Sequence, residues 1–233
     1  MSNLDPRPDE LELRASVVHA VDVIEARKAA IGDGTEVRRL LPARALRTVG
    51  AWCFLDHYGP DDVSAGPGMQ VPPHPHTGLQ TASWLFDGLV RHRDSLGSEE
   101  LIRPGELNLM TSGRAIAHSE ESPEQRPPLL HGVQLWIALP EERRFGDPGF
   151  AHHADLPAFT TADGARVTVV AGEYRGERSP AEVNFVGRSH EEIAAARDAW
   201  SRGEFGEVPG YAGDPLAAPP LPPGELKPRL ARC

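Results

Sequence analysis

The sequence predicts an all-β protein built as a sandwich or a barrel. Glycine and proline are frequent, with 23 of each among 233 residues, and the apolar runs between them are short. Short strands separated by turn-forming residues are typical of sandwiches and barrels, whereas a helical bundle needs longer periodic runs. The length suits one domain of good size, alone or with a small second segment.

The expected strands follow one another along the first three quarters of the chain. Residues 1–10 are expected to form a flexible tail. Alternating apolar positions predict a strand that ends near Ile24, and the Gly-Asp-Gly sequence at residues 32–34 predicts a turn. Further strands are expected at residues 38–46, 51–55, 76–93, 107–110, 129–139 and 167–171, and the Gly- and Pro-rich residues 59–73 are expected to form a loop.

The last quarter of the chain predicts one helix and an extended tail. Ser189 precedes Glu192 by three residues, which is the spacing of a capping box, and an apolar run follows. A helix is therefore expected at about residues 189–203, ending at Gly203. Residues 208–229 contain seven prolines, and a segment so rich in proline favours neither a helix nor a strand ladder.

Composition and charge narrow the possible partners. The formal net charge is −10, and an acidic surface repels the phosphate backbone, so direct binding to nucleic acid is not expected. No apolar stretch approaches the roughly 20 residues that span a bilayer, and the N-terminus lacks the apolar core of a signal peptide. We expect a cytoplasmic protein without membrane or direct nucleic-acid contacts.

Two short motifs carry potential metal ligands. His74 and His76 are two residues apart, so on a strand both imidazoles point to the same face. Pro75 between them suits a strand end or an edge strand. His118 and Glu120 repeat the spacing about forty residues later. If the two strands face each other across a barrel, three imidazoles and one carboxylate surround one ion.

An isolated His-x-His pair often occurs by chance in a surface loop. The second pair at matching spacing therefore favours a metal site over a chance occurrence. Imidazole and carboxylate ligands together suit Fe, Mn, Co, Ni, Cu or Zn. Because neither motif contains cysteine, a thiolate-rich structural zinc site is disfavoured. Four protein ligands would leave up to two positions of an octahedral ion open to dioxygen or to a chelating substrate.

Longer segments resemble a known family. Gly68 followed by His74 and His76, and Pro104-Gly105 followed by His118, look like the two motifs of cupins. The fuller match is to pirins, and it rests on Leu55-Asp56-His57-Tyr58-Gly59-Pro60, His74-Pro75-His76-Thr77-Gly78-Leu79-Gln80-Thr81, His92-Arg93-Asp94-Ser95-Leu96-Gly97, Arg103-Pro104-Gly105 and the run from Met110 to Glu120.

The resemblance implies a fold and a site. It implies a cupin barrel (a double-stranded β-helix, or jelly roll) over residues 11–178, with one C-terminal helix and a Pro-rich tail. The site would hold one divalent transition metal per chain, Fe(II) first among the candidates. Its expected ligands are His74, His76, His118 and Glu120. His57 and His92 are candidates for orienting these ligands, with ordinary structural roles as the alternative.

The resemblance also implies an activity. Pirins are known as quercetin (flavonol) 2,3-dioxygenases, so a flavonoid-like substrate and dioxygen are the expected partners, with Glu120 as the catalytic proton acceptor. The alternative is a non-catalytic, metal-binding regulatory protein of the pirin type that acts through a protein partner. A third reading is a metal-binding remnant without activity that self-associates as a homodimer.

Two departures from the family pattern matter. Gln80 stands where many cupins have a glutamate ligand, so Glu120 must supply the carboxylate. Pirins usually have two barrels, and most of a second barrel is missing between Ser179 and Asn184. Residues 179–233 are therefore expected to form a remnant that consists of a short strand, the helix and the tail.

Overall fold

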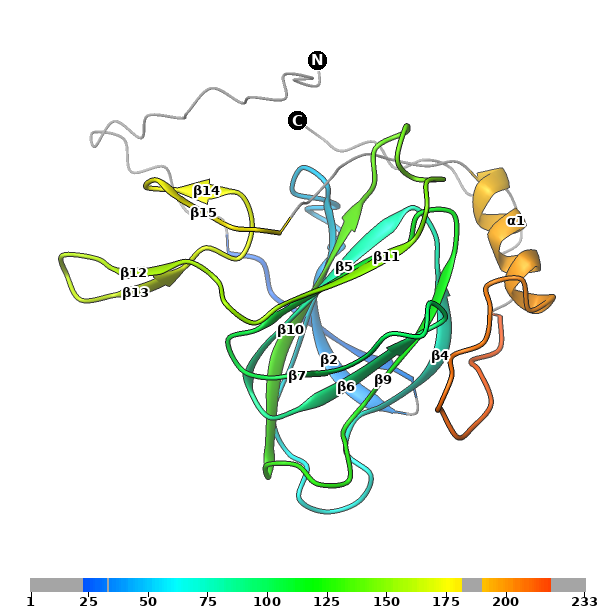
Figure 1. Cartoon of the computed structure of the whole chain (residues 1–233), viewed down its shortest axis with the longest axis horizontal. Coiled ribbons are helices and arrows are strands. Elements are labelled where there is room, and N and C mark those ends of the chain that lie inside the picture. Colours follow the sequence, from blue (N-terminus) through cyan, green and yellow to red (C-terminus); the bar gives the residue numbers. More distant parts are fainter. Residues whose placement is uncertain (1–22, 33, 182–189, 219–233) are drawn as a thin grey trace.

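The computed structural model describes residues 23–32, 34–181 and 190–218, and it consists mainly of antiparallel β-structure. Two sheets lie against each other and enclose the interior (Figure 1). The larger sheet has seven strands in the order β1-β2-β3-β10-β5-β8-β11. Its strands are β1 (Arg27–Ile31), β2 (Thr35–Leu41), β3 (Trp52–Asp62), β5 (Leu79–Asp87), β8 (Leu107–Thr111), β10 (Leu129–Ala138) and β11 (Gly149–His153).

The smaller sheet has four strands in the order β4-β9-β6-β7. These are β4 (Gln70–His76), β6 (Val90–Asp94), β7 (Glu99–Ile102) and β9 (Ile116–Glu121). A tight turn connects β5 of the large sheet to β6 of the small one. Gly88 in this turn has φ +92°, and an added Cβ would lie 2.6 Å from the carbonyl oxygen of Leu129, so only glycine fits there.

Apolar side chains from both sheets fill the interior. The buried cluster combines residues of the large sheet with residues of the small one: Val37, Tyr58, Val63, Met69, Val71, Leu85, Val90, Ile102 and Leu130. Burying one such aliphatic side chain stabilises the fold by about 1.5–3 kcal/mol. This core fixes the two sheets relative to each other and thereby fixes the residues that both of them contribute to the site.

A second apolar cluster lies on the outer face of the large sheet. Ala82, Leu107, Leu109 and Ile137 pack there with Ala181, and Leu156 and Val170 pack against them. Residues 156–181, which pack on this face, contain two small hairpins. One consists of β12 (Ala158–Thr160) and β13 (Arg166–Thr168), the other of β14 (Glu173–Tyr174) and β15 (Glu177–Arg178). Residues 156–181 therefore shield part of this face from water.

The expected loop at residues 59–73 is wrong at both of its ends. Strand β3 continues past Gly59 and Pro60 to Asp62, and β4 begins at Gln70, so that Pro72 and Pro73 lie within a strand. Proline is compatible with β4 because this strand is at the edge of its sheet and pairs only with β9. The edge position expected for Pro75 is confirmed.

The helix is confirmed with slightly different bounds. Helix α1 spans His190–Ser201, and Gly203 after it has φ +74°. Trp200 of the helix donates a hydrogen bond from Nε1 to the carbonyl of Leu216, and the amide of Leu216 donates to the carbonyl of Pro73 on the free edge of β4. This part of the expected tail is thus attached to the barrel.

Several expectations fall on residues outside the described ranges. These are the flexible tail at residues 1–10, the strand before Ile24 apart from its last two residues, the capping serine at 189, the short strand near residues 184–188 and the tail beyond residue 218. The division into a barrel and a remnant stays a prediction. Within the described ranges, no helix is long and apolar enough to cross a membrane.

Candidate metal centre

Two neighbouring strands bring three histidines together. In the pairing of β4 with β9, His74 lies opposite His118, and His76 lies opposite Ile116. A bulge between Val71 and His74 adjusts the register at this point. The two motifs are therefore adjacent in one sheet, which corrects the expectation that their strands face each other across the barrel.

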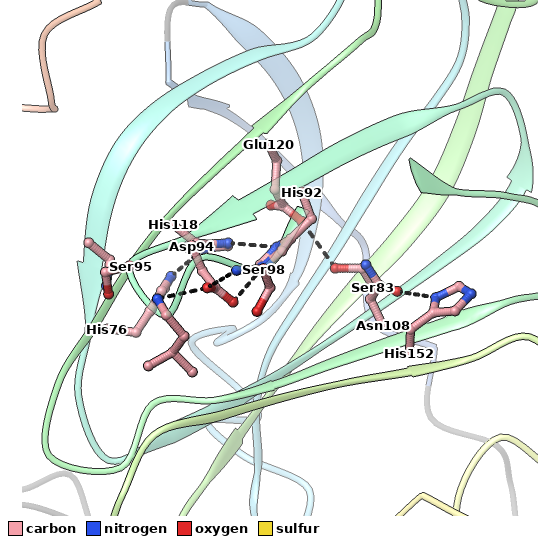
Figure 2. Close-up of polar contacts among 12 residues, drawn as sticks. His76, Ser83, His92, Asp94, Ser95, Ser98, Asn108, His118, Glu120 and His152 are labelled. Atoms are coloured by element: carbon pink, nitrogen blue, oxygen red, sulfur yellow. Dashed lines mark hydrogen bonds and ion pairs between the residues drawn. The ribbon is translucent and has the colours of Figure 1, made fainter. Parts of the chain in front are cut away.

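The nitrogens of the three imidazoles converge. One ligand atom from each of His74, His76 and His118 lies within 4.8 Å of the others. His76 Nε2 and His118 Nε2 are 3.0 Å apart (Figure 2). His74 Nδ1 lies 2.9 Å from the carbonyl oxygen of Pro72. Because a carbonyl only accepts, this Nδ1 carries the proton, and Nε2 of His74 keeps its lone pair for an ion.

The surroundings keep the rings of His118 and His74 neutral. His118 is only 1% exposed and His76 is buried, while His74 is half-buried. Burial lowers the pKa of His118 well below its usual value, and the neighbouring His74 and His76 lower it further. Burial also lowers the pKa of His74. A neutral imidazole is the form that binds a metal ion.

Glu120 is close to this group but turned toward the large sheet. Gln134 Nε2 donates to both carboxylate oxygens, at 2.9 and 2.7 Å, and Ser83 Oγ donates to Oε1 at 3.1 Å. The indole Nε1 of Trp136 donates to Gln134 Oε1 at 3.2 Å. Since an indole only donates, this bond fixes which end of the Gln134 amide faces Glu120.

The four predicted ligands thus form two overlapping groups. Three of them are the histidines described above, and Glu120 groups instead with His118 and with His92, again within 4.8 Å. His118 belongs to both groups. Gln80, which replaces a glutamate of other cupins, donates to Thr111 Oγ1 at 2.9 Å.

The donor set fits a transition-metal ion. Imidazole nitrogens that bind one ion at about 2.1 Å in neighbouring positions lie roughly 3 Å apart, which matches the separation of His76 Nε2 and His118 Nε2. At this distance, either one neutral ring donates its N–H to the lone pair of the other, or a cation lies between the two lone pairs. A cation therefore suits this pair when both nitrogens keep their lone pairs.

Comparisons with known proteins identify the family. The sequence profile of pirin matches residues 34–137. The chain is similar to the crystal structure of quercetin 2,3-dioxygenase from Acinetobacter baumannii, with a TM-score of 0.81 and 34% identity over 86% of this chain and 95% of that one. The chain belongs to the pirin family. The expected cupin barrel is confirmed with it.

Curated relatives of this pirin are longer. A Pseudomonas aeruginosa protein with the provisional name quercetin 2,3-dioxygenase is 50% identical over 163 residues, which is 70% of this chain and 51% of that protein. A pirin-like protein of Caulobacter vibrioides is 42% identical over 168 residues, 69% of this chain and 58% of that one. The pirin described here spans little more than half the length of these relatives.

Sequence reasoning missed three residues of the site. Gln134 and Ser83 bond to Glu120 although they are distant from it in sequence, and no local motif marks them. Asp94 is fully buried and accepts a hydrogen bond from His92. The i, i+2 spacing of His92 and Asp94 on β6 repeats the spacing of the ligand pairs, and this signal could have identified Asp94.

The two histidines proposed as orienting residues have different surroundings. His92 Nδ1 lies 3.4 Å from His118 Nδ1, so His92 touches a predicted ligand. His57 instead receives hydrogen bonds from Arg38, and its Nε2 lies 2.8 Å from His131 Nε2. No contact between His57 and a predicted ligand is seen, so the ordinary structural role suits it.

A cavity of about 510 Å³ lies near the site. Its lining includes Gln80, Thr111 and Phe150, and Phe150 stacks on the His92 ring with centroids 4.5 Å apart. None of the four predicted ligands lines this cavity. Of those four residues, only His74 is more than marginally exposed.

Proposed function

We propose that this pirin is a metal-dependent dioxygenase of the quercetin 2,3-dioxygenase type. The observation that carries the proposal is the group of His74, His76 and His118, whose nitrogens converge, with burial lowering the pKa of His118 and of His74 so that these two rings are in the neutral form that a metal requires. The names of the relatives supply the substrate class, which is a flavonol or a similar aromatic chelator. Dioxygen is the second substrate.

The proposed site binds one divalent transition metal. Nε2 of His74, His76 and His118 would hold the ion, with Glu120 as the fourth ligand of the proposal. Iron(II) is our first choice, and Mn, Co, Ni, Cu and Zn also fit these ligands. When bound, the ion acidifies a coordinated hydroxyl group and brings oxygen and substrate together.

Glu120 is the proposed proton acceptor. Its carboxylate receives hydrogen bonds from Gln134 and Ser83, which hold it next to the predicted ligand His118. In the proposal, Glu120 takes the proton of the substrate hydroxyl next to the ketone oxygen. Trp136 holds the Gln134 amide and packs edge-on against the His76 ring, with centroids 4.8 Å apart, and thereby excludes water from this side.

The experiment measures bound metal and oxygen-dependent loss of quercetin absorbance in untagged protein. Wild type is expected to bind about one ion per chain and to turn over quercetin. His76→Ala is expected to lose the metal. Glu120→Gln is expected to keep most of the metal and to lose turnover by about 10²–10⁴-fold, the usual contribution of a proton acceptor. His131→Asn, outside the site, serves as the control.

The results separate the parts of the proposal. Metal binding without turnover of any flavonol would contradict the enzymatic proposal and keep the metal site. If wild type and the control His131→Asn both bind no metal, the metal site and the enzymatic activity are both contradicted. Turnover that survives in Glu120→Gln would remove Glu120 from the chemistry and leave the histidines in place.

The alternative function is metal-dependent regulation through a protein partner. It is favoured by one observation, since three of the four predicted ligands are buried and none of the four lines the 510 Å³ cavity beside them. A catalytic pocket usually gives its substrate access to the reacting group. Metal-dependent binding of a protein partner without flavonol turnover would support this function. Cytoplasmic location, iron as the metal and a homodimer all stay predictions.

A further inference from the structure

Behind His118, on the side away from His76, lies a buried pair of polar residues. His118 Nε2 faces His76, whereas His118 Nδ1 faces His92 Nδ1 at 3.4 Å. The other nitrogen of His92, Nε2, lies 3.2 Å from Asp94 Oδ2 (Figure 2). Strand pairing places the groups in this order, because β6 sets His92 opposite Glu120 and Asp94 opposite His118.

Asp94, at the end of this series of contacts, is buried and held in place by hydrogen bonds. It is 0% exposed, and its Oδ1 accepts hydrogen bonds from the amides of Leu96 and Ser98 at 2.9 and 3.0 Å. Burial alone would raise the pKa of Asp94, yet the hydrogen bonds from His92 and Ser98 hold it below its usual value. Asp94 is therefore ionised at neutral pH and can only accept hydrogen bonds.

Because Asp94 is an acceptor, it determines which nitrogen carries the proton in His92 and, through His92, in His118. Because Asp94 only accepts, a neutral His92 carries its proton on Nε2 and leaves a lone pair on Nδ1. That lone pair faces His118, so the proton of His118 belongs on Nδ1, where it is donated to His92. Nε2 of His118 is then left with a lone pair that points toward His74 and His76.

Packing holds the ring of His92 in this orientation. Phe150 of β11 stacks on it nearly in parallel, with an interplanar angle of 13° and centroids 4.5 Å apart. The ring of His92 also lies next to the ring of His118, with centroids 5.2 Å apart. The stacking fixes the plane of the His92 ring, and a half-turn within this plane would remove Nε2 from Asp94 and Nδ1 from His118, so the two hydrogen bonds set which nitrogen faces which partner.

We propose that His92 and Asp94 are positioning residues that fix the tautomer of His118, so that its Nε2 is the nitrogen presented to the metal. The inference rests on the proposed metal site. A partner that fixes the tautomer of a metal-binding histidine and raises its basicity commonly contributes 10–100-fold to metal affinity. A purely structural role for the pair would affect folding but would not select the His118 tautomer.

The direct test is nitrogen-15 NMR of the histidine rings in apo and in Zn²⁺-loaded protein. At neutral pH, the apo protein is expected to show His118 protonated on Nδ1 and His92 protonated on Nε2, and zinc should attach to Nε2 of His118. A His118 protonated on Nε2 in the apo protein, or zinc attached to His118 Nδ1, would overturn the inference.

Zinc affinity of matched variants gives a second readout. His92→Leu removes both hydrogen bonds of the ring and is expected to weaken zinc binding by about 10–100-fold. His92→Gln is expected to restore most of the affinity, because an amide can accept from His118 and donate to Asp94. His131→Asn is the control. Equal losses in the Leu and Gln variants would overturn the inference.

The two proposals fail in different ways. If neither zinc nor iron(II) binds wild-type protein, the proposed function fails, and the tautomers of the apo protein still test the pair of His92 and Asp94. If zinc binds as expected but the apo tautomers are reversed, the inference fails and the proposed metal site stands. A second zinc ion bound by His92, His118 and Glu120 would also overturn the inference, because His92 would then be a ligand.

Discussion

Single residues of the site illustrate what a local pattern can and cannot reveal. The i, i+2 spacing of His74 with His76 predicted that both rings share a face, because alternation along a strand is a local property. The roles of Gln134 and Ser83 depend on which strands become neighbours, and no local property encodes that. The sequence therefore led to the histidines and left out the residues that hold Glu120.

Gln134 is the residue on which the position of Glu120 depends most. Gln134→Leu removes both hydrogen bonds that its amide donates to the carboxylate and leaves a buried charge poorly satisfied. Such a loss costs about 1–3 kcal/mol of the free energy of unfolding, or more for a charged group. Urea unfolding followed by circular dichroism measures the change.

Trp136→Phe is the milder companion of this variant. It keeps a ring beside His76 and removes the indole donor to Gln134 together with part of the ring that packs on Phe54. The expected loss is about 0.5–1.5 kcal/mol, the net contribution of one hydrogen bond. If Trp136→Phe destabilises the protein as much as Gln134→Leu, the indole acts mainly by packing. The role assigned to it, which is to hold the Gln134 amide against Glu120, would then be wrong.

At the scale of elements, strand existence was easier to predict than strand bounds or partners. Most apolar runs became strands, but the loop expected at residues 59–73 was read from glycine and proline alone. The structure tolerates Pro72 and Pro73 in β4 because the edge of the small sheet needs no hydrogen-bond donor there. Edge positions follow from the topology of the whole sheet, which explains the error.

Strand β5 offers a test of how alternation divides buried from exposed positions. Leu85 is 1% exposed and belongs to the interior cluster, whereas its neighbour Phe86 is 53% exposed. Leu85→Ala is expected to lower the free energy of unfolding by about 2–5 kcal/mol, the usual cost of a cavity in a packed core.

Phe86→Ala is the matched control, with an expected change of about 0.5 kcal/mol or less for an exposed position. Thermal and urea unfolding measure both variants. Equal losses would mean that the inner and outer faces of β5 are assigned incorrectly, together with the placement of Ser83 toward Glu120 on the same strand.

At the scale of the whole molecule, the site is formed between the two sheets that enclose the interior, and both sheets contribute residues to it. The predicted ligand histidines come from the small sheet, while Gln134, Ser83 and Trp136 come from the large one. The resemblance of the motifs to pirins predicted the cupin barrel, but it did not predict that the strands of the two motifs are neighbours in one sheet. Composition alone predicted only a sandwich or a barrel.

Burial of neutral histidines predicts how the metal-free protein responds to acid. Burial lowers the folded-state pKa of His118 and of His74 below the value of 6.5 that applies to the unfolded chain. Below about pH 6.5, the unfolded chain therefore binds protons that the folded protein does not. The free energy of unfolding is at its full value above this pH and falls as the pH drops toward the folded-state values.

The expected loss for one fully buried imidazole approaches about 1.4 kcal/mol per pH unit. Urea unfolding of chelator-treated protein at pH 7.5, 6.5 and 5.5 measures it. Asp94, whose pKa is also lowered, contributes a separate loss only near and below its usual value of 3.8. His118→Asn is expected to show a shallower decline between pH 6.5 and 5.5 than wild type. A wild-type stability that stays level or rises over this interval would mean that these imidazoles accept protons freely in the folded state, and the interior would then be wetter than the packing of the two sheets implies.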